Sequence, residues 1–443
     1  MAKKGNPLNG TGQRLWKRAR KIIPGGNQLL SKRSERFLPE FWPAYYSKAK
    51  GAYVWDLDGR KYLDMSIMGV GCNVLGYADK DVDRAAKDAI DRSSMCTLNT
   101  PQEIELAELL VKLHPWADMC RFARTGGEAM AVAARIARAY TGRDVIAICG
   151  YHGWADWYLA TNLAKKDALA QHLLSGLKPR GVPKTLRGTV YPFHYNRIDE
   201  LKKILKKHPK LAAIIMEPVH GEAPKGNFLK QVRVLAKKSG AVFIFDEITI
   251  GWRLAVGGAH LQLDVKPDMA IFAKGMSNGY PMAAIIGTRN IMQAAQDTFI
   301  SSTYWTDRIG PAATIASIKK MQRVNLPKRL ARIGAQVKKV WEENAEKHGI
   351  HVEISGFLPL LFFKFPGKDR EAVKTLFVQE MLKRGILSSD QFYASYAHTD
   401  AHVRQYARAL DEVFAVIGKA LREGKVRRLL KGPVASSNFQ RLN

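Results

Sequence analysis

The sequence predicts an α/β protein with a mostly parallel sheet covered by helices, together with a smaller α+β domain. Two observations favour this class. First, the middle of the chain contains short apolar runs without apolar–polar alternation, as in strands that are buried on both faces. Second, helical patterns lie between several of these runs, and alternating strands and helices indicate a parallel sheet. The apolar runs are residues 145–150, 188–193, 211–218, 241–247, 269–274 and 282–287.

The intervening helical patterns have apolar residues three and four positions apart. We expect Gly142 and Gly240 to end two of these helices, because glycine is the usual residue just past a helix C-terminus. The patterns cover residues 128–142, 201–208 and 228–240.

Beyond about residue 316 the pattern changes to that of a smaller α+β domain. The expected elements there are a long helix at 310–345, antiparallel strands within 351–365, a helix at 369–384, a short strand at 385–389 and a final helix at 400–420. Near the N-terminus, Asp58-Gly59 predicts the turn of a short strand pair. We therefore expect an N-terminal segment at 1–60 that joins the small domain, a large domain at 61–316 and the C-terminal small domain at 317–443.

Composition excludes several classes of protein. With 46% apolar and 25% charged residues, the 443-residue chain is typical of a packed globular protein and not of a disordered chain, a collagen or a coiled coil. No stretch of 18 consecutive apolar residues predicts a membrane span, and the basic N-terminus lacks the apolar core of a secretory signal. The four cysteines lack the spacing of a metal site, so we expect reduced thiols, no metal and a cytoplasmic location.

The net charge of +30 has three possible explanations. A basic surface can bind nucleic acid, attract anionic substrates or surfaces, or simply be solvated. No zinc-finger, homeodomain or RNP pattern is present, and the lysines of 202–207 have the helical spacing of a solvated face. We therefore favour diffuse or substrate-linked charge over a nucleic-acid partner.

The strongest chemical signal is a carboxylate and a lysine at the ends of two apolar runs. Asp246 is the penultimate residue of the run 241–247, and Lys274 ends the next run, 28 residues after Asp246. Asp246 alone could be a structural cap or half of an ion pair, but an unpaired buried ammonium is costly. A lysine that forms a Schiff base with an aldehyde cofactor loses that charge. A neighbouring carboxylate then keeps a pyridinium nitrogen protonated, so that the ring acts as an electron sink.

Three further features follow or precede predicted elements. Gly126 and Gly127 precede a helix and could offer N–H groups to a phosphate, or form only a turn. Tyr151 and His152 lie between glycines and could cover a planar ring, or form a packed loop. Thr303 could donate a hydroxyl to a phosphate, or cap the helix that follows.

In this order, the four features resemble the fold-type I pyridoxal-phosphate (PLP) enzymes of the class III aminotransferase group. Within that group the chain looks most like glutamate-1-semialdehyde aminomutase and related aminotransferases. The FDE…K pair is the specific part of the resemblance, which covers nearly the whole chain. The matching motifs are IPGG at 23–26, VWDLDGRKYLDM at 54–65, GGEAM at 126–130, GYHG at 150–153, EPV at 217–219, FDEI at 245–248, KGMSNGYP at 274–281 and SYAHTD at 395–400.

The resemblance implies a large PLP-binding domain with a seven-stranded sheet, and it assigns roles around the ring. By resemblance, Lys274 is the Schiff-base lysine and proton shuttle, and Asp246 is the partner of the pyridine nitrogen. Ile248 and Tyr151 pack on opposite faces of the ring. His152 and Glu217 match motif positions of the cofactor site.

The phosphate contacts are also implied by the resemblance. Gly126 and Gly127 resemble the backbone donors to the phosphate. Thr303 is similar to the threonine that reaches the phosphate of the partner subunit, which implies a homodimer with shared active sites.

The implied function is that of an aminotransferase, which moves an amino group from an amine donor to a carbonyl acceptor. Intramolecular transfer by an aminomutase, racemisation, and a catalytically idle basic binding protein are the alternatives. The sequence departs from the aminomutase pattern at Gly127, at Trp154 and at NQLLSKR (27–33). These changes argue against tetrapyrrole synthesis and for another amine acceptor.

Overall fold

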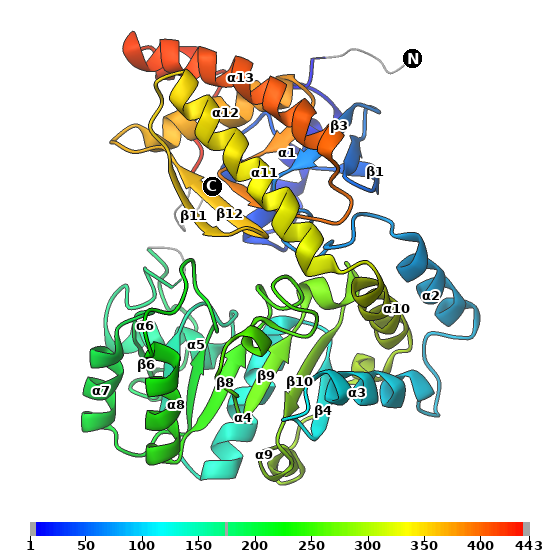
Figure 1. The fold of residues 1–443 in the computed structure, drawn as a ribbon, viewed down its shortest axis with the longest axis vertical. Coiled ribbons are helices and arrows are strands. Elements are labelled where there is room, and N and C mark those ends of the chain that lie inside the picture. The colour runs from blue at the N-terminus through cyan, green and yellow to red at the C-terminus, as the bar shows by residue number, and fades with distance from the viewer. Residues whose placement is uncertain (1–5, 173–175, 437–443) are drawn as a thin grey trace. The chain divides into compact units, whose positions relative to one another are not determined.

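The computed structural model describes residues 6–172 and 176–436, and the chain divides into two compact units (Figure 1). One unit combines Met1–Asp79 with Lys328–Asn443, and the other is Lys80–Pro327. The boundaries expected from the sequence, 60/61 and 316/317, lie earlier in the chain than these divisions. Over the described ranges, no helix has both the length and the apolar character needed to cross a membrane.

The unit Lys80–Pro327 is built on a seven-stranded sheet with the order β4-β10-β9-β8-β7-β5-β6. Strand β10 is antiparallel to both of its neighbours, and all other pairs are parallel. The predicted fold class is therefore confirmed, and each of the six apolar runs contains a strand. The strands are β4 (Met119–Ala123), β5 (Ile146–Cys149), β6 (Val190–Pro192), β7 (Ala213–Met216), β8 (Val242–Asp246), β9 (Met269–Phe272) and β10 (Ala283–Gly287).

Strand β4 was not predicted from the pattern of apolar runs. Its sequence, MCRFA, contains Arg121, and its first four side chains are only partly buried. A strand of this composition resembles a loop in sequence. Its place in the sheet comes from pairing with β10, which lies far away in the chain.

Helices cover both faces of this sheet, because alternate residues of each strand point to opposite sides. Ile244 belongs to the core under α4 (Gly126–Thr141), whereas Phe243 belongs to the core under α7 (Ile198–Lys207) and α8 (Phe228–Ser239) (Figure 1). The lysines of 202–207 are exposed, as predicted for a solvated face. The remaining α-helices of this unit are α2 (Lys80–Asp91), α3 (Pro101–Leu113), α5 (Asp156–Leu159), α6 (Thr161–Ala164), α9 (Arg289–Gln293) and α10 (Ile309–Arg323).

Gly142 and Gly240 end α4 and α8 as the sequence predicts. Both have left-handed backbone conformations, with φ of 64° and 66°. Glycine adopts this conformation without the steric cost that a Cβ imposes, so both helices end in a favourable αL cap.

The other unit joins N-terminal and C-terminal segments in one sheet. Its strands have the order β1-β2-β3-β13, and β13 pairs in parallel with β3, with Ile386 opposite Leu63. A second sheet has the order β11-β12-β14. The elements are β1 (Tyr46–Lys50), β2 (Tyr53–Asp56), β3 (Lys61–Met65), β11 (Glu353–Phe357), β12 (Leu360–Lys364), β13 (Ile386–Ser388), β14 (Gln391–Tyr393), α1 (Thr11–Ile22), α11 (Leu326–Lys347), α12 (Arg370–Lys383), α13 (Asp400–Arg422) and α14 (Val426–Leu429).

The expectation of one long helix at 310–345 is wrong. The structure has two helices there, because α10 ends at Arg323 and α11 begins at Leu326. Between them, Asn325 has a φ of 44°. A left-handed residue interrupts the helical hydrogen-bond ladder, and asparagine tolerates this conformation better than most residues.

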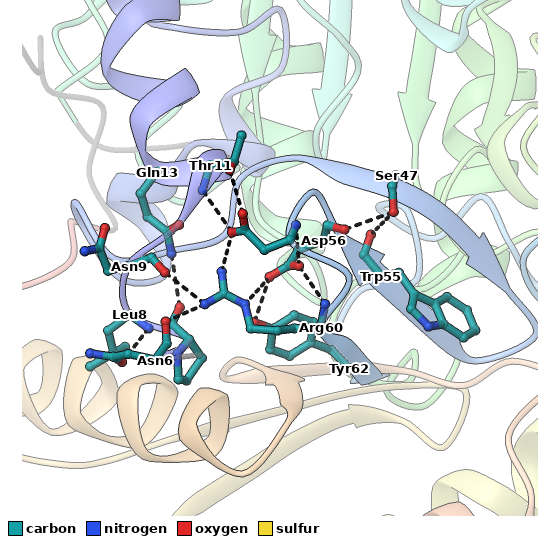
Figure 2. A network of polar contacts seen from close by, with 12 residues as sticks. Asn6, Leu8, Asn9, Thr11, Gln13, Ser47, Trp55, Asp56, Arg60 and Tyr62 are labelled. Carbon is teal, nitrogen blue, oxygen red and sulfur yellow. Dashed lines mark hydrogen bonds and ion pairs between the residues drawn. The ribbon is translucent and has the colours of Figure 1, made fainter. Parts of the chain in front are cut away.

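Arg60 ties the N-terminal segment to the turn between β2 and β3 (Figure 2). Its guanidinium lies 2.7 Å from both Asp56 and Asp58 and also donates to the carbonyl oxygens of Asn9 (2.8 Å) and Asn6. Asp58 in turn accepts a hydrogen bond of 2.9 Å from the N–H of Thr11, at the start of α1. The predicted Asp58-Gly59 turn therefore also anchors the N-terminal segment.

Candidate active site

Asp246 and Lys274 lie at the carboxyl ends of two adjacent parallel strands. Asp246 is the last residue of β8 and pairs in register with Ile271 of β9. Lys274 follows three residues later and begins a short 3₁₀ turn, with a φ of 47°. The carboxyl edge of a parallel sheet is where α/β proteins place ligand sites.

Asp246 is held as a buried carboxyl with a specific partner on each oxygen. Its Oδ2 lies 2.8 Å from Nδ1 of His152, and its Oδ1 accepts a 3.0 Å hydrogen bond from the N–H of Ile248. Burial raises the pKa of Asp246 above its usual range, and the hydrogen bond with His152 opposes that shift. His152 is itself 1% exposed, and within the described ranges its Nε2 has no hydrogen-bond partner.

The amine of Lys274 donates a 2.9 Å hydrogen bond to Oγ1 of Thr249. Thr249 was not predicted as a site residue from the sequence. The available signal was its position three residues after Asp246, in the turn that leaves the same strand end.

Helix α4 offers two unpaired backbone donors at its first residues. Thr125 is its N-cap and forms a reciprocal capping box with Glu128. Within the described part of the chain, the N–H groups of Gly126 and Gly127 have no hydrogen-bond partner. A Cβ on Gly126 would lie 2.8 Å from Cδ1 of Ile248, so the helix start approaches the turn after β8 closely.

The loop after β5 packs against this helix start. Gly153 has a φ of 102°, and a Cβ on it would lie 3.1 Å from Cα of Gly127. In the same loop, the N–H of Tyr151 donates to Glu217 (3.4 Å), and Tyr151 remains 42% exposed. The carboxylate of Glu217 also contacts Nδ1 of His220, a residue that was not predicted from the sequence to belong to the site. The structure thus brings the β5 loop, the α4 start and the Asp246 turn together.

Thr303 lies in the same unit, in the short turn Thr303–Thr306, and its side chain is exposed. The alternative that Thr303 caps the following helix is wrong. Helix α10 begins at Ile309, and Asp307 supplies the side-chain oxygen that accepts from the N–H of Gly310 (3.1 Å).

An α/β sheet with a buried aspartate and a lysine at its carboxyl edge defines the class as that of the fold-type I PLP enzymes. The chain belongs to the class-III aminotransferase family, which matches residues 39–414. The protein is therefore a PLP-dependent aminotransferase, as the motifs predict.

Individual relatives cover nearly the whole chain. A 3-aminobutyryl-CoA aminotransferase of Cloacimonas acidaminovorans (strain Evry) is 31% identical over 428 residues, which are 92% of this chain and 97% of that protein. A glutamate-1-semialdehyde 2,1-aminomutase of Nitrosopumilus maritimus (strain SCM1) is 30% identical over 412 residues, covering 87% of this chain and 95% of the relative. The solved PLP internal aldimine form of the Sphingopyxis sp. MTA144 FumI protein has a TM-score of 0.84 and 26% identity, and the match covers 93% of this chain and 98% of that one.

Proposed function

We propose that Lys274 is the residue that bonds covalently to the cofactor, and that Asp246 binds the pyridine nitrogen. The position of these two groups at neighbouring strand ends, with Asp246 buried, is the observation that carries the proposal. The donor set also fits the cofactor. Two unpaired N–H groups, on Gly126 and Gly127, suit a phosphate at a helix N-terminus.

When bound, the cofactor supplies an electron-withdrawing ring that stabilises negative charge on the adjacent carbon of the substrate. The residues of the chain control the protons around it. As an anion, Asp246 holds a proton on the ring nitrogen, and His152 keeps the carboxylate oriented through its 2.8 Å contact. Ile248 and Tyr151 would cover the two faces of the ring, and Glu217 accepts a hydrogen bond from the backbone N–H of Tyr151.

Lys274 then acts as general base and general acid. When not bonded to the cofactor, the amine of Lys274 would take a proton from the α-carbon of a bound donor and return it to a neighbouring carbon. The cofactor would carry the amino group from the donor, which water would release as a carbonyl compound, to the carbonyl acceptor of the second half-reaction. The relatives are named for different amino compounds, so we propose an amine donor and a carbonyl acceptor without naming a particular substrate.

We further propose a homodimer with shared sites, in the cytoplasm. The exposed hydroxyl of Thr303 supports the dimer, because an exposed residue can contribute to the phosphate site of another copy. The four free cysteines fit a reducing compartment. Mixing Lys274→Ala with Thr303→Ala protomers tests the dimer: shared sites predict that hybrids regain activity at one site, and unchanged inactivity of verified hybrids contradicts this.

The experiment for Lys274 is an absorbance scan before and after addition of amine donors. We expect the wild type to show a band at roughly 410–430 nm that shifts to about 330 nm with a productive donor, and Lys274→Ala to lose both the band and turnover. Lys266→Ala, which removes an exposed lysine of the same unit, is the matched control. Retention of the band and of turnover in Lys274→Ala would refute the assignment.

A further inference from the structure

The hydroxyl of Thr249 lies beside the reactive amine. We propose that Thr249 is a positioning residue that orients the amine of Lys274 before it bonds to the cofactor and while it is free between the two proton transfers. This inference rests on the proposed role of Lys274. It adds a residue that no motif of the sequence identified.

The hydrogen bond fixes which way the amine points. Lysine has a long side chain with many rotamers, so an unrestrained amine samples many positions. By donating one N–H to Oγ1 of Thr249 at 2.9 Å, Lys274 Nζ takes a defined position. In the neutral amine, the donated hydrogen then lies on the side of Thr249 and the lone pair points elsewhere, where it can attack a carbonyl carbon or accept a proton.

The chemical type of the partner matters as much as its position. A carboxylate next to the amine would favour the charged ammonium, which is neither nucleophile nor base. A threonine hydroxyl accepts a hydrogen bond without adding a charge.

Thr249 is held in place by a rigid turn. Its carbonyl oxygen accepts a 2.9 Å hydrogen bond from Nε of Arg253, which is 1% exposed. The N–H of Gly251 closes the turn onto the carbonyl of Glu247 at 2.8 Å. Glu247 is fully buried and accepts hydrogen bonds from the N–H groups of Ala259 and His260. Threonine is also β-branched and therefore stiff at χ1, so the hydroxyl is a fixed reference point for the amine.

The test compares Thr249→Val, which keeps the shape and removes the acceptor, with Thr249→Ser, which keeps the hydroxyl. The full-length protein is stripped of cofactor, and the rate of covalent attachment of added pyridoxal 5'-phosphate is followed by stopped-flow absorbance and confirmed by borohydride trapping and mass spectrometry. Binding of pyridoxamine 5'-phosphate, which cannot bond to the lysine, reports separately on the pocket.

We expect Thr249→Val to slow covalent attachment about fivefold to tenfold, the effect of one lost hydrogen bond, with unchanged affinity for pyridoxamine 5'-phosphate. Thr249→Ser should remain within about twofold of the wild type. Thr249→Ala also removes the acceptor, so it should slow attachment to the same extent, and it replaces the valine variant if valine disturbs folding. A wild-type rate in the valine and alanine variants, or an equal loss of pyridoxamine 5'-phosphate affinity, would overturn the positioning role. Lys274→Ala separates the two proposals, since attachment at the wild-type rate in that variant would instead refute the role of Lys274.

Discussion

The pair formed by His152 and Asp246 allows a quantitative prediction about pH. We consider His152→Leu, which removes the group 2.8 Å from Asp246 Oδ2 and leaves an apolar side chain in its place. Asp246 must be ionised to hold a proton on the ring nitrogen, so the rate of the first half-reaction falls as the pH drops through the pKa of Asp246. Burial already raises this pKa, and the hydrogen bond with His152 restrains the rise.

The size of the shift follows from the strength of that hydrogen bond. A hydrogen bond to a charged group contributes about 1.5–3 kcal/mol. One pKa unit corresponds to about 1.36 kcal/mol. Loss of the bond should therefore raise the pKa of Asp246 further, by about one to two units, and the acid side of the rate profile should move to higher pH by the same amount. Well above both pKa values the two rates should converge.

The assay is single-turnover conversion with a saturating amine donor, measured across pH in a stopped-flow instrument. It gives the rate of the first half-reaction on the acid side of the profile. The matched control is His152→Asn, because asparagine has nearly the shape of leucine but can place an N–H close to the position of Nδ1. We expect the asparagine variant to keep most of the wild-type profile. If the rate falls at the same pH in the leucine variant and in the wild type, the argument that His152 lowers the pKa of Asp246 is refuted.

Two further predictions concern backbone and anchor contacts. Gly153→Ala introduces a Cβ at a φ of 102° and 3.1 Å from Cα of Gly127. We expect the loop to shift and the affinity for pyridoxamine 5'-phosphate, measured by fluorescence titration, to fall about tenfold. Unchanged affinity would show that the loop does not shape the phosphate site. Arg60→Met should destabilise the N-terminal anchor by about 2–4 kcal/mol, because Asp56 is left buried without its 2.7 Å ion-pair partner, and should speed proteolytic cleavage in the N-terminal segment. Arg14→Met, at an exposed position of the same network, is the control and should change the rate of cleavage little. Equal rates of cleavage in the Arg60 and Arg14 variants would contradict the claim that Arg60 anchors the N-terminal segment.

Local patterns account for much of the fold and for the choice of chemistry. Apolar runs buried on both faces predicted six of the seven strands of the large sheet, because continuous burial leaves a continuous apolar signal. The stops at Gly142 and Gly240 could be predicted because the αL cap depends on one residue type. Asp246 and Lys274 could be singled out because charged groups at the ends of buried strands conflict with their surroundings unless they have a function.

Contacts between distant segments decided the rest. Strand β4 and the pairing of β13 with β3 depend on partners far away in the chain, and no local pattern encodes a partner. The division of the expected long helix at Asn325 is a backbone choice that helical periodicity does not reveal.

The site shows the same division between sequence and tertiary structure. The sequence by itself determined the family, the cofactor and the two residue types at the strand ends. Only the tertiary structure placed His152 against Asp246 and Thr249 against Lys274. Hydrogen-bond partners are set by where loops from different strands meet, and that geometry exists only once the sheet has assembled.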